Sequence, residues 1–217
     1  HGIKIFNARG VYSIPMAEFV LAGVLQLYKQ SAFIQKKKKN HEWNKHRGLL
    51  ELYQKNVCIV GCGSVGNECA KRFKGFGCYV TGVDIKPYEN ESFDTMLPLD
   101  SLDNALNNAD IIILTLPLTN ETHHIINSDR LNAMKQGSVL VNVARGAVVD
   151  TQALVNNLRT NLMGAVLDVF ETEPLSRNSI LWDLDNVIIT PHNSFVSDGN
   201  HQRMLKVIIS SLEGFAK

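Results

Sequence analysis

The stretch NVCIVGCGSVG, residues 56–66, joins an apolar run to a glycine-rich turn. The run is short, contains β-branched residues and stops at a glycine, which is typical of a buried strand. Gly61, Gly63 and Gly66 fit the pattern G-x-G-x-x-G, and residues 65–76 then read as a helix. A strand, such a turn and a helix, in this order, form the context that a dinucleotide-binding turn requires.

Each glycine has a separate task in such a turn. Gly61 allows the tight bend, Gly63 lets the backbone approach a pyrophosphate, and Gly66 lets the helix pack close to the sheet. The phosphates would lie at the N-terminus of the helix, where free N–H groups and the helix dipole favour anions. The alternative is a strand-to-helix turn with a structural role only.

Asp84 ends a second apolar run, residues 78–84, and lies 18 residues after Gly66. A carboxylate at this position can accept hydrogen bonds from both ribose hydroxyls of an adenosine and would repel a 2′-phosphate. It therefore predicts NAD rather than NADP, although Lys86 two residues on weakens that choice. The alternative is a simple turn residue at the end of a strand.

The rest of the chain continues the alternation of strands and helices. This alternation predicts an α/β fold, a doubly wound parallel sheet of the Rossmann-like dinucleotide-binding type, and the nearly continuous apolar strands agree with burial on both faces. We expect Ser13, Ser128 and Asp150 to cap helices. Further strands are predicted at residues 109–117, 138–144, 163–169 and 186–191, and helices at 13–30, 128–136, 150–159 and 195–215.

Three polar residues follow late strands of this predicted sheet: Arg145, Glu173 and His192. Ligands of open parallel sheets bind outside the carboxyl ends of the strands, so these side chains can converge there. Arg145 offers a planar charged fork that matches a carboxylate, and His192 can transfer a proton near neutral pH. Glu173 beside His192 would stabilise the imidazolium. This set suits hydride transfer to a 2-oxo acid. Taken singly, each residue reads better as an ordinary surface polar group at a strand end.

At this point the sequence resembles the D-isomer-specific 2-hydroxyacid dehydrogenases over nearly its whole length. The resemblance implies that Arg145 binds the substrate carboxylate, that His192 is the acid/base and that Glu173 supports it. The matching segments are VGCGSVG with Asp84, TLPLTNETHHIIN (115–127), VNVARGAVVD (141–150), GAVLDVFETEPL (164–175) and LWDLDNVIITPH (181–192).

The resemblance also implies further contacts with the cofactor NAD. The backbone at Ser64 and Val65 would bind the pyrophosphate, and Asp168 would contact the nicotinamide carboxamide. The remaining expected contacts are Leu116, Pro117 and Thr122 on the far side of the cofactor, and Val143 and Ala144 at its nicotinamide end.

The same resemblance implies that most of a separate substrate domain is missing upstream, since the family has about a hundred more residues there and this chain begins with His1 rather than Met. We expect residues 1–12 to be a remnant of that domain or of its linker, and residues 13–191 to form the NAD-binding domain. Within it, helix 13–30 would form a homodimer interface. Residues 192–217 would return to the substrate domain. Whether the chain turns over without that domain stays open.

The activity that the resemblance implies is hydride transfer between NAD(H) and a 2-oxo or 2-hydroxy acid of D configuration, with glyoxylate, hydroxypyruvate or phosphoglycerate-type substrates. The alternative is an NAD(H)-sensing binding protein of the same fold, similar to the corepressors of this family. The residues after TPH, NSFVSDGN (193–200), depart from the small residues and glycines of many members.

Bulk properties narrow the partners of the chain. Its 217 residues carry a net charge of +1, which gives no reason to expect nucleic acid, and no apolar run is long enough to cross a bilayer. No signal peptide is visible, and four cysteines without a zinc spacing fit a cytoplasmic protein. Lys36 to Lys39 read as a solvated helix end or, alternatively, a nucleic-acid patch. No metal site is expected: His123 and His124 resemble ligands only superficially.

Overall fold

A computed structural model of the protein describes residues 5–215, and its centre is a parallel sheet of seven strands in the order β3-β2-β1-β4-β5-β6-β7. The sheet reverses its direction of winding between β1 and β4, so the predicted doubly wound fold is confirmed. The strands are β1 (Asn56–Val60), β2 (Tyr79–Asp84), β3 (Thr95–Pro98), β4 (Ile111–Leu114), β5 (Val139–Asn142), β6 (Gly164–Leu167) and β7 (Val187–Ile189).

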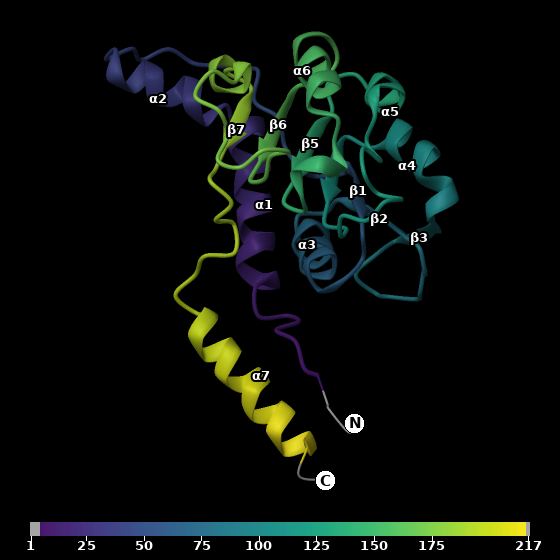
Figure 1. The fold of residues 1–217 in the computed structure, drawn as a ribbon. Helices are drawn as coiled ribbons and strands as arrows, with labels where there is room; N and C mark the ends of the chain where they lie inside the picture. Colours follow the sequence, from purple (N-terminus) through teal and green to yellow (C-terminus); the bar gives the residue numbers. More distant parts are fainter. Residues whose placement is uncertain (1–4, 216–217) are drawn as a thin grey trace.

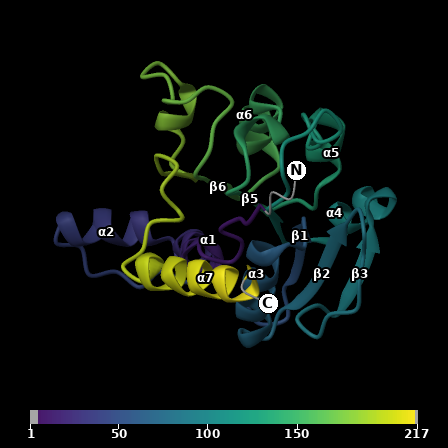
Figure 2. The same ribbon diagram turned by 60° about the horizontal axis from the view of Figure 1, so that its bottom comes forward.

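Helices cover both faces of this sheet (Figures 1 and 2). The α-helices are α1 (Ser13–Tyr28), α2 (Ser31–Lys39), α3 (Ser64–Gly75), α4 (Leu102–Asn108), α5 (Ser128–Ala133), α6 (Thr151–Thr160) and α7 (Asn200–Phe215). Three short 3-10 turns complete the described elements: η1 (Leu99–Ser101), η2 (Gly146–Val148) and η3 (Ile180–Asp183).

The two faces of the sheet have separate apolar cores. On one face, α1 and α3 place Val24 and Phe73 against the strands. On the other, α4, α5 and α6 contribute Leu106, Leu131 and Leu154. Because side chains alternate along a strand, each central strand feeds both cores, which explains why these strands read as unbroken apolar runs.

The strand register aligns the carboxyl ends of the sheet. Leu114 of β4 pairs with Asn142 of β5, Asn142 with Leu167 of β6, and Leu167 with Ile189 of β7. Residues that follow these positions therefore emerge at one edge of the sheet. This register is the reason that Arg145 emerges at the same edge of the sheet as the segments that follow β6 and β7.

Helix α7 extends away from the sheet, beside the segment that leads into α1 (Figure 1). The guanidinium of Arg203 in α7 donates to the carbonyl oxygen of Val11 at 2.7 Å. Leu205, Ile208 and Leu212 of this helix are exposed. No helix among residues 5–215 is both long enough and apolar enough to cross a membrane.

Several boundaries differ from those read from the sequence. Ser13 lies inside α1 and donates to the carbonyl of Gly10, so it does not cap the helix. Asn127, not Ser128, caps α5 by accepting the N–H of Arg130, whereas Asp150 caps α6 as predicted. The last helix starts later than expected because the 193–199 segment forms turns. Elements β3, α4 and α2 were not predicted from the sequence.

Candidate active site

The glycine-rich turn between β1 and α3 has the shape that a dinucleotide phosphate needs. Gly61 has φ +92°, and a Cβ there would lie 2.7 Å from the backbone nitrogen of Leu116. A Cβ on Gly66 would overlap the carbonyl oxygen of Gly61, so α3 packs tightly against the turn. A Cβ on Gly63 would meet nothing within 4 Å, and no side chain caps the N-terminus of α3. The turn thus presents an open, donor-rich surface that fits a pyrophosphate.

Asp84 holds the end of β2 against this turn. Its Oδ2 accepts the backbone N–H of Cys62 at 2.8 Å, and its Oδ1 accepts the N–H of Lys86 at 3.0 Å. A carboxylate has about four lone-pair positions, so free capacity remains for the hydroxyls of a ribose. Asp84 therefore lies beside the glycine-rich turn, although its contact with a ribose stays a prediction.

A cleft of about 580 Å³ runs from the start of α3 to Arg145. Six of the residues predicted to bind the cofactor or substrate line it together, and Met16 and Thr115 line it as well, although neither was predicted. The predicted residues are Val65, Leu116, Pro117, Val143, Ala144 and Arg145. The structure thus gathers residues from four separate segments around one cavity.

Thr122, which was predicted to contact the cofactor, does not line this cleft but supports the loop after β4 that does. Its hydroxyl donates to the carbonyl of Pro117 at 2.8 Å and accepts the N–H of Thr119 at 2.7 Å. The side chain is nearly buried. In this structure Thr122 fixes the loop that carries Leu116 and Pro117.

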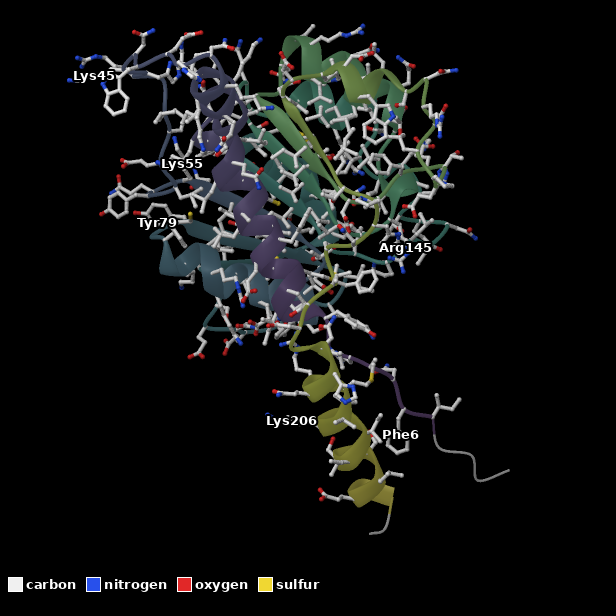
Figure 3. All side chains as sticks on the ribbon, turned by 90° about the vertical axis from the view of Figure 1, so that its left-hand side faces the viewer. Phe6, Lys45, Lys55, Tyr79, Arg145 and Lys206 are labelled. Carbon is white, nitrogen blue, oxygen red and sulfur yellow. The ribbon has the colours of Figure 1, made fainter. Side chains whose placement is uncertain are left out.

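Arg145 lies three residues after Asn142, the last residue of β5. Asn142, a buried residue, accepts the N–H of Ala144 and donates to the carbonyl of Arg145, each at 3.0 Å. A Cβ on Gly146 would overlap the backbone of Phe170, so only glycine allows this turn to pack on the segment after β6. The Arg145 side chain is exposed at the surface of the domain (Figure 3). Sequence reasoning missed Asn142, although a polar residue inside the apolar strand VLVNVA was a signal.

His192 and Glu173 form a direct pair. His192 Nδ1 lies 2.8 Å from Glu173 Oε2, and Glu173 Oε1 accepts the backbone N–H of Phe170 at 3.0 Å. Burial favours the neutral acid, but the hydrogen bonds from His192 and Phe170 and the charges of His192 and Arg145 prevail and lower the pKa of Glu173. Glu173 is thus a carboxylate held against the imidazole, with the charge of Arg145 close enough to act on it.

His192 and Glu173 face a second cavity rather than the cleft of Arg145. This cavity, of about 540 Å³, is mostly apolar and includes Trp182 and Leu175. The three predicted catalytic residues therefore line two different cavities, with Arg145 in one and Glu173 and His192 in the other. The charge of Arg145 nevertheless lowers the pKa of Glu173, so the two cavities interact electrostatically.

Asp168 lies directly after β6 and is completely buried. Its carboxylate accepts hydrogen bonds from the hydroxyl of Thr190 and from the N–H groups of Asn193 and Ser194. The predicted contact with a nicotinamide carboxamide stays a prediction.

His123 and His124 stack on each other in the loop after β4, with ring centroids 4.1 Å apart. His124 Nε2 lies 3.1 Å from Glu171, whose other carboxylate oxygen accepts the N–H of Thr151. Within residues 5–215, no group of three or more His, Cys, Asp or Glu side chains is arranged to hold a metal ion.

The family model described as "D-isomer specific 2-hydroxyacid dehydrogenase, NAD binding domain" matches residues 21–194. This match covers most of the chain, including the glycine-rich turn, Arg145, Glu173 and His192. The chain therefore belongs to the D-isomer specific 2-hydroxyacid dehydrogenase family and carries that family's NAD-binding domain.

Individual relatives agree with this assignment. A glyoxylate reductase of Pyrococcus horikoshii is 35% identical over 100% of this chain and 67% of its own length. A D-lactate dehydrogenase of Treponema pallidum is 34% identical over 94% of this chain and 66% of its own. A solved structure is also similar: the crystal structure of a D-isomer specific 2-hydroxyacid dehydrogenase from Xanthobacter autotrophicus in complex with NADPH and MES. It matches with a TM-score of 0.86 at 29% identity, and the match covers 100% of this chain and 89% of that one. The chain thus spans about two thirds of the length of the curated relatives.

Proposed function

We propose that the protein to which this chain belongs is an NAD-dependent 2-hydroxyacid dehydrogenase that acts on a 2-oxo or 2-hydroxy acid of D configuration. The observation that carries the proposal is the His192–Glu173 pair at 2.8 Å, within electrostatic reach of Arg145 and at the same sheet edge as the glycine-rich turn. A cation for a carboxylate, a proton donor and a dinucleotide cleft are the groups that reduction of a 2-oxo acid requires. Glyoxylate, hydroxypyruvate and phosphoglycerate-type compounds are the substrates to test.

The roles of the side chains follow from their geometry. Arg145 binds the substrate carboxylate through its planar guanidinium, which matches two oxygens at once. Glu173 engages Nδ1 of His192, so Nε2 is the ring nitrogen that exchanges a proton with the substrate oxygen. Glu173 also stabilises the protonated imidazole before that transfer. The bound dinucleotide would supply or accept the hydride.

The choice between NAD and NADP rests on Asp84. Its carboxylate lies beside the glycine-rich turn and would repel a 2′-phosphate. We therefore propose NAD as the preferred cofactor. The Xanthobacter autotrophicus structure is a complex with NADPH, whereas Asp84 is the feature of this chain that favours NAD.

The direct test is oxidation of NADH with a panel of glyoxylate, hydroxypyruvate and pyruvate, using the full-length protein and this chain side by side. Turnover with at least one acid is expected from the full-length protein. NADH binding without turnover of any acid would instead favour a sensing protein of the same fold. Equal kcat/KM for the two proteins would mean that sequence beyond this chain is not needed.

Two further proposals concern partners and location. We expect a homodimer through α1, whose Phe19, Leu21 and Leu25 are only partly buried, and sedimentation velocity would reveal a monomer if this is wrong. A cytoplasmic location is supported by the four cysteines, all buried and unpaired, since disulfides are rare in reducing compartments. Microscopy of the tagged full-length protein would test the location.

A further inference from the structure

The loop after β2 is held at both ends by one residue of the glycine-rich turn, Cys62. At one end, the carboxylate of Asp84 accepts the backbone N–H of Cys62 at 2.8 Å. At the other end, the hydroxyl of Tyr88 donates to the carbonyl oxygen of Cys62 at 2.8 Å. The chain from Asp84 to Tyr88 is therefore a short loop that is closed on the turn proposed to bind the pyrophosphate.

Asn67, in the first turn of α3, extends this contact to the helix. Its side-chain amide donates to the hydroxyl of Tyr88 at 2.7 Å and to the carbonyl oxygen of Cys62 at 2.8 Å. Its side-chain oxygen accepts the amide of Asn90, whose own oxygen accepts the N–H of Ser92 at 2.9 Å. The Tyr88 hydroxyl thus both donates and accepts, and it joins the loop to the turn and to α3 in one hydrogen-bond network.

Burial contributes little to the position of this loop. Residues 85–89 are all exposed, and Ile85 and Tyr88 have relative exposures of 73% and 44%. A loop with few buried apolar contacts opens at a low cost in free energy unless hydrogen bonds hold it. The closed position therefore depends on the hydrogen bonds at the two ends of the loop, and the Tyr88 hydroxyl is the group that makes them at the far end.

The charges of the loop connect its position to the choice of cofactor. Lys86 is the only basic residue between Asp84 and Asp94, and Glu89 and Glu91 follow it. The backbone N–H of Lys86 donates to the carboxylate of Asp84 at 3.0 Å. A 2′-phosphate at the ribose needs a cation beside it, as an arginine provides in proteins that bind NADP. The closed loop limits the positions that the Lys86 ammonium can take for this purpose.

We propose that Tyr88 is a positioning residue that favours NAD over NADP, because it holds residues 84–88 closed on Cys62 and so keeps Lys86 from pairing with a 2′-phosphate. The inference deepens the proposed function and rests on its cofactor site. A ligand that binds only the open loop must supply the free energy of opening, so NADPH meets a cost that NADH does not. Removal of the Tyr88 hydroxyl lowers that cost and leaves Asp84 in place.

The test uses Tyr88→Phe, which removes the hydroxyl and keeps the ring. Tyr79→Phe is the matched control, because Tyr79 is also exposed and lies at the opposite end of β2 from Asp84. Lys86→Ala, alone and combined with Tyr88→Phe, asks whether Lys86 is the cation that the open loop releases. The readouts are the Kd values for NADH and NADPH by fluorescence titration, and amide hydrogen exchange over residues 85–90.

In Tyr88→Phe we expect the Kd for NADPH to fall by about threefold to tenfold, the range that corresponds to loss of one hydrogen bond. The Kd for NADH should change less than about twofold, because Asp84 can still accept hydrogen bonds from the ribose. The amides of residues 85–90 should exchange faster. Tyr79→Phe should keep the parental Kd values and exchange rates, and the addition of Lys86→Ala to Tyr88→Phe should remove the gain for NADPH.

An unchanged ratio of the two Kd values in Tyr88→Phe would overturn the proposal, and so would a gain for NADPH that survives Lys86→Ala. These titrations require no turnover, so they separate this inference from the proposed function. A parent protein that oxidises NADH with no oxo acid would contradict the proposed dehydrogenase, and one that binds NADPH as tightly as NADH would contradict the proposed preference for NAD. In both cases the change in the ratio on Tyr88→Phe still decides the role of Tyr88.

Discussion

Nδ1 of His192 lies 2.8 Å from Oε2 of Glu173, and this contact leaves Nε2 as the ring nitrogen for the proton transfer proposed above. In a pair of this kind the carboxylate holds the Nδ1 proton, so the second nitrogen is left for proton transfer. Because Glu173 is itself held by the N–H of Phe170, the orientation of the imidazole is defined before any substrate arrives.

Replacement of His192 by Asn should lower kcat by about a hundredfold or more, since general acid–base catalysis contributes about 10² to 10⁴. The Kd for NADH should change little, because the imidazole is assigned to the substrate oxygen. Stopped-flow reduction of an oxo acid, with a separate NADH titration, measures both. A variant whose pH–rate profile kept the parental ionisation would show that another group is the acid/base.

Glu173→Gln should alter the pH dependence of stability. The pKa of Glu173 is lowered from its ordinary value of 4.5, because its hydrogen bonds and the charges of His192 and Arg145 outweigh its burial. A carboxyl group with a lowered pKa in the folded state stabilises the protein above its ordinary pKa, and this contribution is lost as pH falls through the lowered value. The difference in Tm between parent and variant should therefore be constant from neutral pH to about pH 5 and shrink in more acidic solution. A difference that grew toward acid pH would have the wrong sign.

Arg145→Ala should reduce kcat/KM for the oxo acid by about tenfold to a hundredfold, which corresponds to the roughly 1.5–3 kcal/mol of a charge-assisted hydrogen bond. Arg145→Lys should recover only part of this loss, because an ammonium cannot match a carboxylate with two parallel bonds. Steady-state kinetics with glyoxylate would measure the effect. An equal loss of NADH affinity would contradict the role of Arg145 in substrate binding.

Gly146→Ala should destabilise the domain by about 1–3 kcal/mol or more, the usual cost of overpacking, because its Cβ would overlap the backbone of Phe170. Gly75→Ala is the matched control, because a Cβ there meets nothing within 4 Å. Alanine in a helix should raise the free energy of unfolding by up to about 1 kcal/mol relative to glycine. Urea denaturation compares the two. Equal stability in the two variants would mean that the contact between Gly146 and Phe170 relaxes at little cost.

Asp84→Asn should weaken NADH binding by about tenfold, since a charged hydrogen-bond acceptor is replaced by a neutral group. The Kd for NADPH should improve relative to that for NADH, because the repulsion of a 2′-phosphate is removed. Parallel titrations with both cofactors measure the ratio. If the ratio of the two Kd values does not change, a residue other than Asp84 determines the choice between NADH and NADPH, and Lys86 is the first candidate.

The sequence was sufficient for the sheet and most of its helices, because the central strands are buried on both faces and have no polar interruption except Asn142. It was insufficient for β3, whose residues are only partly buried or exposed and give no apolar run. The cap of α5 was misplaced because Asn127 and Ser128 are adjacent polar residues that can both cap a helix, and only geometry separates them. The predicted cap of α1 was wrong because Ser13 is already helical and no side chain caps that helix.

The candidate site was predictable in part, because residues that follow predicted strands of a parallel sheet lie at the same edge. Arg145 and Asp84 could be placed by the position of their strands alone. The contact between His192 and Glu173 was predicted, but the burial of Asp168 was not, since a carboxylate after an apolar strand gives no indication of which way it turns. The tasks of Asn142 and Thr122 depend on turns of three to five residues, which sequence patterns do not specify.

The packing of Gly146 on Phe170 and the buried bonds of Asp168 have a consequence for the origin of specificity. The groups that would move the proton and hold the substrate carboxylate directly follow, or lie a few residues after, three adjacent strands of one domain, β5, β6 and β7. A second domain that selects among acids could then be exchanged or reshaped while the chemical machinery stays intact. With such a division, proteins that share this sheet could act on different 2-oxo or 2-hydroxy acids.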